Sequence, residues 1–219
     1  MTQTALIGHL VHRIRRRLCF ARSDHLGVQL RRHALASDTG AQTVREALDL
    51  IHRIAPEKIS AMRTCLPGGI AIEWTDYANG WFDAATGTCC LGGQFVATAG
   101  PVDLALTVVH ELCHARLERC GIGYPEDQRD RIERLCVSRE IAFARALARA
   151  GCGDAITVDA LCRKRDSLTA AQFSDTALRA LHRREVLHRA RMLGMQTPHC
   201  VRRCLVLATR KRLRRLRQG

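Results

Sequence analysis

The sequence predicts an α+β fold, in which a small mixed β-sheet has helices before and after it. The spacing of the apolar residues is helical in the first part of the chain, alternates over residues 70–74, and is helical again after residue 101. A proline–glycine turn at 66–69 marks the first change of period. With 219 residues, of which 47% are hydrophobic, the chain can form one ordinary domain, or one domain with an appendage.

Three helices are expected before the sheet. The first spans residues 4–22, where a stripe of apolar side chains lies opposite an arginine-rich face. A break at 37–40 precedes the second helix, which has Thr43 as the N-cap of a capping box and ends at Pro56. A short third helix is expected at about 57–65.

Three short strands are expected to form the sheet. Residues 70–74 alternate between apolar and polar side chains, and residues 81–82 and 88–91 lie between turn signals. We expect the segment between Gly87 and Gly93 to be the edge strand, directly before the next helix. A peptide could then pair with the main chain of this strand and lie across that helix.

Two long helices after the sheet are expected to form an antiparallel hairpin. The first begins at Pro101 and ends before Gly121 and Gly123. The second begins at Pro125, has an acidic first turn as the helix dipole favours, and ends at Gly151.

The first helix of this hairpin contains the sequence His110-Glu111-Leu112-Cys113-His114, which has the H-E-x-x-H pattern. Residues i and i+4 share a helix face, so His110 and His114 can bind one metal ion, with Glu111 beside the water that the metal activates. The alternative is a surface helix with two unrelated histidines. The pattern predicts a Zn²⁺ site for hydrolysis, with Glu111 as the catalytic base.

A catalytic zinc site needs a third protein ligand and an open position for water. A second helix that returns antiparallel at about 1.5 Å per residue passes the levels of His114 and His110 near positions 132 and 136. Glu133 falls between these levels and is the preferred third ligand. Glu140 lies on the same face but further along, where it could orient a ligand histidine. With a longer hairpin loop, Glu140 becomes the third ligand instead.

Peptide hydrolysis also requires a hydrogen-bond donor for the oxyanion. Tyr124, in the loop between the two long helices, is the preferred candidate for this catalytic role. His182 and His188 are alternative donors. A hydrophobic cap on the turn is the alternative role for Tyr124.

The chain contains eleven cysteines at irregular spacings and no C-x-x-C motif. This odd count without a paired framework indicates reduced thiols and a cytoplasmic location. Cys113 and Cys136 are expected to pack near the metal site, where they could react with oxidants or metals. No apolar run is long enough to span a bilayer, so no transmembrane segment is expected.

The net charge of +14 is concentrated at the two ends of the chain. Residues 1–24 contribute +4 (five Arg, one Asp), residues 154–219 contribute +11 (sixteen Lys or Arg, five acids), and the middle contributes −1. We therefore expect an N-terminal helical region at 1–67, a catalytic core at 68–153 and a basic helical C-terminal region. Nucleic acid or another polyanion could bind the C-terminal region, which includes a segment faintly similar to a helix-turn-helix near 190–201.

With a helical glutamate nineteen residues after His114, the motif resembles that of the gluzincin-type zincin metallopeptidases, which include the thermolysin-like enzymes. The preceding strand and the sequence Glu140-Ile-Ala-Phe143-Ala144 are similar to the ImmA/IrrE-like minimal metallopeptidases. The resemblance covers residues 68–150 and implies a minimal zincin-like domain that cleaves a protein substrate inside the cell. Cys90, followed by Leu91, resembles the Cys-Leu element of peptide deformylases and is an alternative ligand.

A second hypothesis belongs to another class of protein. The chain would then be a nucleic-acid-associated regulatory protein whose zincin domain is inactive or only structural. Metal content, peptide cleavage and salt-dependent DNA binding distinguish the two hypotheses.

Overall fold

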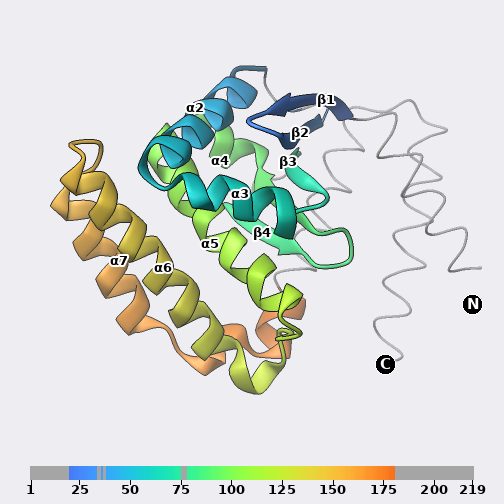
Figure 1. The fold of residues 1–219 in the computed structure, drawn as a ribbon. Coiled ribbons are helices and arrows are strands. Elements are labelled where there is room, and N and C mark those ends of the chain that lie inside the picture. Colours follow the sequence, from blue (N-terminus) through green and yellow to red (C-terminus); the bar gives the residue numbers. More distant parts are fainter. Residues whose placement is uncertain (1–19, 34–35, 37, 75–77, 181–219) are drawn as a thin grey trace, which may run out of the picture. The chain divides into compact units, whose positions relative to one another are not determined.

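The computed structural model describes residues 20–33, 36, 38–74 and 78–180. It has the α+β fold that the sequence predicts, with a five-stranded mixed sheet and a layer of helices (Figure 1). Most of the helix expected at 4–22 lies outside these residues. Residues 181–219 of the basic C-terminal region, which include the helix-turn-helix-like segment, also lie outside them.

The sheet has the strand order β1-β2-β3-β5-β4. The inner pairs, β2–β3 and β3–β5, are parallel, whereas the two outer pairs are antiparallel. The strands are β1 (Phe20–His25), β2 (Val28–His33), β3 (Gly69–Glu73), β4 (Gly80–Asp83) and β5 (Thr88–Gly92).

The helix α5 (Pro101–Arg119) is central to the helical layer. It packs against helices from the earlier part of the chain, against β4 and β5, and against the returning helix α6. Such a helix has few solvent-facing positions, which explains why its apolar residues are not confined to one stripe. The other helices are α2 (Asp38–Ile54), α3 (Pro56–Cys65), α4 (Gly93–Thr98), α6 (Arg129–Arg149) and α7 (Ala155–Ser167), with short 3₁₀ turns at η1 (Glu126–Gln128) and η2 (Ala170–Phe173). Figure 1 shows α7 alongside α6.

Residues 20–22, expected at the end of a helix, belong instead to a β-hairpin. Leu26 and Gly27 form its turn, and both have positive φ angles, 53° and 71°. This conformation is typical of two-residue hairpin turns, but leucine adopts it rarely, so the sequence carries little turn signal. Arg63 of α3 stabilises the turn by donating two hydrogen bonds to the carbonyl oxygen of Leu26 (2.9 and 2.6 Å).

The start predicted for the second helix is also wrong. Helix α2 begins at Asp38, so Thr43 lies inside the helix and is not an N-cap. Gly40, taken as part of a break, instead permits close packing, because a Cβ atom there would lie 2.6 Å from Cγ1 of Val96. Val96 belongs to α4, a short helix that the sequence did not predict.

The prediction that the segment from Gly87 to Gly93 is the edge strand is wrong. Strand β5 lies between β3 and β4, and β4 is the outermost described strand on this side. Only residues 84–87 connect β4 to β5, and so short a connection allows only an antiparallel hairpin. The parallel partner β3 occupies the other side of β5, so β4 is left at the edge.

The domain organisation also differs from the prediction. Strand β2 pairs with β3, so residues before 67 share one sheet with the expected core. The chain divides into two compact units after Thr169, and α7 belongs to the first of them. Within the described residues, no helix is both long and apolar enough to cross a membrane.

Candidate metal centre

The candidate site lies between α5 and α6. Helix α5 ends in a Schellman motif, in which the N–H groups of Gly121 and Ile122 donate to the carbonyl oxygens of Glu118 and Leu117 (both 2.9 Å). Gly121 has a φ of +75°, which glycine adopts without strain. This ending reverses the chain, so that α6 returns beside the H-E-x-x-H turn of α5.

Three potential ligand groups, those of His110, His114 and Glu133, lie at the corners of a small triangle. The Nε2 atoms of His110 and His114 are 3.2 Å apart. Oε2 of Glu133 lies 3.2 Å from Nε2 of His110, and Oε1 of Glu133 lies 3.3 Å from Nε2 of His114. Ligands about 2.0–2.1 Å from a tetrahedral zinc ion would be about 3.3 Å apart. The three side chains therefore lie close enough together to share one metal ion.

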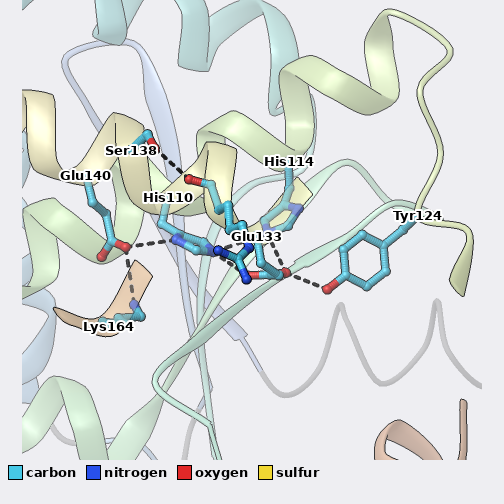
Figure 2. A network of polar contacts seen from close by, with 8 residues as sticks. His110, His114, Tyr124, Glu133, Ser138, Glu140 and Lys164 are labelled. Carbon is cyan, nitrogen blue, oxygen red and sulfur yellow. Dashed lines mark hydrogen bonds and ion pairs between the residues drawn. The ribbon is translucent and has the colours of Figure 1, made fainter. Parts of the chain in front are cut away.

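Glu140 approaches His110 from the opposite side of the imidazole ring. A carboxylate oxygen of Glu140 lies 3.0 Å from Nδ1 of His110 and 3.2 Å from Nζ of Lys164 in α7 (Figure 2). A proton on Nδ1 directs the lone pair of Nε2 toward the triangle. Glu140 therefore lies where it orients a ligand, and the geometry favours Glu133 as the third member of the triangle.

The two carboxylates also change the proton affinity of His110. Burial lowers the pKa of His110, but hydrogen bonds to Glu133 and Glu140 outweigh burial and raise this pKa to about 10. Burial raises the pKa of Glu133, but its hydrogen bonds with His110 and His114 reverse this effect and keep the carboxyl group ionised. A protonated His110 thus lies between the two carboxylates.

Tyr124 reaches the site, but its hydroxyl group is directed toward Glu133. The hydroxyl donates a short hydrogen bond of 2.5 Å to Oε1 of Glu133, as Figure 2 shows. Burial and the charge of Glu133 raise the pKa of Tyr124, so the phenol keeps its proton. Its ring meets the ring of His114 edge-on, and Arg129 lies 5.3 Å from its centroid. The hydrogen bond to Glu133 favours a role for Tyr124 in positioning that carboxylate. The alternative donors His182 and His188 lie outside the described residues.

Glu111 lies on the side of α5 that faces the edge strand. A Cβ atom added to Gly80 of β4 would lie 3.5 Å from Cγ of Glu111 and 2.7 Å from Cγ2 of Thr107. Glu111 is 5% exposed, and no described side chain donates a hydrogen bond to its carboxylate. Burial raises the pKa of Glu111, although His110 and His114 act in the opposite direction. The carboxylate is therefore prepared to take up a proton.

Cys136 lies near the site, as the sequence predicts, but its place among the possible metal ligands was not predicted. Its Sγ atom and the ligand nitrogens of His110 and His114 all lie within 4.8 Å of one another. Cys136 also packs against Cys113, and a hydrogen bond from Cys136 lowers the pKa of the Cys113 thiol. The spacing of three residues between Glu133 and Cys136 places both side chains on one face of α6. Cys90, the upstream alternative, does not belong to this group.

No protein-family model matches the chain, and comparisons with curated proteins and with solved structures found no match. The function of the chain is therefore inferred from its own residues and their geometry.

Proposed function

We propose that the chain is a zinc-dependent peptidase of the zincin type, which hydrolyses peptide bonds in a protein substrate. The observation that carries this proposal is the triangle of His110, His114 and Glu133. Glu111 follows His110 in the sequence, and the charges of the triangle act on its pKa. Two imidazoles and one carboxylate with an open fourth position are the ligand set of catalytic zinc sites in peptidases. Imidazole ligands also favour zinc over magnesium or calcium.

Each residue has a distinct part in the proposed reaction. A bound zinc ion supplies Lewis acidity, which acidifies water and polarises the carbonyl group of the substrate. Glu111 takes a proton from the attacking water and donates it to the amine nitrogen as the peptide bond breaks. Its raised pKa supports both transfers, because the carboxyl group can hold the proton between them. Glu140 and Tyr124 keep His110 and Glu133 in position.

Strand β4 offers a place for an extended substrate. The N–H group of Gly92 donates to the carbonyl oxygen of Asn79 (3.0 Å), so this pair and the Trp81–Cys90 pair are the hydrogen-bonded pairs of the β4–β5 ladder. The main-chain groups of Gly80 and Phe82 therefore point away from β5. A peptide that pairs with them would pass beside Glu111, as in other cases of strand addition.

The thiols support a cytoplasmic site of action. All eight cysteines in the described part of the chain are free, including the neighbouring pair Cys113 and Cys136. Neighbouring buried thiols remain reduced in a reducing compartment. The proposed substrate is accordingly a protein of the same compartment.

A second function is favoured by the charge of the C-terminal region. Residues 154–219 contribute +11 of the net charge of +14, which suits binding to nucleic acid or another polyanion. In that case the metal centre would be structural, and DNA binding would weaken steeply as the salt concentration rises. Removal of residues 209–219 would then reduce DNA binding without affecting the metal content.

Metal analysis and one variant test the peptidase proposal. We expect about one zinc ion per chain. Glu111→Gln should keep the zinc and reduce cleavage of a mixed peptide library by about 10²–10⁴-fold, because the general base is lost. Glu118→Gln, the same change at an exposed position of α5, is the matched control. A zinc-loaded Glu111→Gln protein that cleaves as fast as the wild type would refute the proposal.

A further inference from the structure

Cys136 lies beside the metal triangle and is completely buried. It is 0% exposed and lies one helical turn after Glu133 on α6. Its Sγ atom is within 4.8 Å of the ligand nitrogens of both His110 and His114. No other described cysteine belongs to this group.

The distances bring Cys136 close to coordination geometry. A thiolate about 2.3 Å from a tetrahedral zinc ion, with imidazole nitrogens at about 2.0–2.1 Å, lies about 3.6 Å from each nitrogen. A displacement on the order of 1 Å would therefore bring Sγ into the ligand shell. Rotation of the Cys136 side chain can supply such a displacement.

The packing around Cys136 favours this position. Cys113 of α5 and Ile132 of α6 form a small apolar cluster with Cys136, separate from the main core. These neighbours exclude water from the sulfur atom. A zinc ion with two imidazole nitrogens and one carboxylate still accepts a fourth ligand, and thiolate is a preferred one.

We propose that Cys136 is a fourth protein ligand, which closes the metal centre and keeps it in a latent state. The inference depends on the proposed zinc site and adds a mode of regulation to it. When the sulfur–metal bond forms, the S–H bond of Cys136 breaks, and its proton is released to solvent. The sulfur then occupies the position that water needs for hydrolysis, because a site with four protein ligands has no open position. Withdrawal of Cys136 opens the site again.

Cobalt spectroscopy of the full chain tests the proposal. One equivalent of Co²⁺ is added to the metal-free protein, and the absorption spectrum is recorded for the wild type, Cys136→Ala and Cys113→Ala. We expect a thiolate-to-cobalt charge-transfer band in the wild type and in Cys113→Ala, and loss of that band in Cys136→Ala. Cys113→Ala is the matched control, because it removes the other thiol of the same cluster. The zinc form of Cys136→Ala should also cleave the peptide library several-fold faster than the wild type.

Each other outcome overturns the inference and bears differently on the proposed function. If Co²⁺ binds without a thiolate band, the latent ligand is refuted but the metal centre stands. A band that persists in Cys136→Ala assigns it to another thiol and likewise refutes only this inference. A chain that binds no Co²⁺ refutes both proposals. The wild-type spectrum alone decides the first of these cases, so the test does not depend on the variant folding.

Discussion

The carboxylate of Glu140 lies 3.0 Å from Nδ1 of His110, on the side of the ring opposite to Glu133. Glu140 is 4% exposed, and its other partner is Lys164 at 3.2 Å. The imidazole of His110 is thus held between two carboxylates from the same helix, α6. Glu133 contacts Nε2 of His110, the nitrogen proposed to bind metal. Glu140 contacts Nδ1 and so fixes the direction in which Nε2 points.

We expect Glu140→Gln to weaken zinc binding by about 10–100-fold, as is typical for residues that orient ligand histidines. The amide still accepts a hydrogen bond from Nδ1 but no longer carries the charge that makes the imidazole a stronger ligand. Competition with a chromogenic chelator measures the affinity, with Glu118→Gln as the control. An unchanged affinity would mean that Glu140 serves only the ion pair with Lys164.

Tyr124→Phe distinguishes a positioning role from a catalytic one. If the hydroxyl mainly fixes Glu133, zinc affinity should fall by about 10-fold while the zinc-saturated enzyme keeps most of its kcat. If the hydroxyl stabilises the oxyanion instead, kcat should fall by about 10²–10³-fold with zinc affinity unchanged. We expect the first result, because the hydroxyl donates to Glu133. Measurement of both quantities on the same preparation separates the two roles.

Removal of the metal should destabilise the chain. Zinc at a concentration 100 times its Kd stabilises the folded state by about 2.7 kcal/mol through mass action. We therefore expect a chelator to lower the Tm of the wild type and to have little effect on the Tm of His110→Ala. His52→Ala, at an exposed position of α2, should behave like the wild type. Equal chelator effects on the wild type and on His110→Ala would contradict a metal site at His110.

Gly80 controls how closely β4 approaches the proposed base. In Gly80→Ala, the new Cβ would lie 2.7 Å from Cγ2 of Thr107, which is too close for ordinary packing. We expect a loss of about 1–3 kcal/mol in the free energy of unfolding. Thr107→Ser removes Cγ2 and should restore most of this stability in the double variant. Denaturant unfolding of the four proteins measures the coupling, and strictly additive effects would contradict direct contact.

Local spacing was sufficient to predict part of the site. His110 and His114 share a helix face because the helix repeats every 3.6 residues, and this holds in any fold that keeps α5 helical. The position of Glu133 required a further assumption, a short antiparallel return. The Schellman ending at Gly121 provides that return, and Glu133 lies level with both histidines.

Other features were predicted wrongly because their causes are not local. The hairpin turn at Leu26 and Gly27 depends on Arg63, which is far away in the sequence. Helix α2 includes Gly40, and Val96 of α4 packs against that glycine. The edge strand is β4 and not β5, because β3 and β4 occupy the two sides of β5. None of these contacts leaves a periodic signal in the sequence.

By itself, the sequence determined the α+β class, the helix hairpin after the sheet, and the faces that bear His110, His114 and Glu133. Those features follow from helix and strand periods and from turn residues, which act over a few positions. Only the tertiary structure decided that Glu140 meets Nδ1 of His110, that Tyr124 donates to Glu133 and that Cys136 approaches the histidines. Each of these relationships depends on how α5 and α6 are rotated and spaced, which is set by packing between residues far apart in the chain.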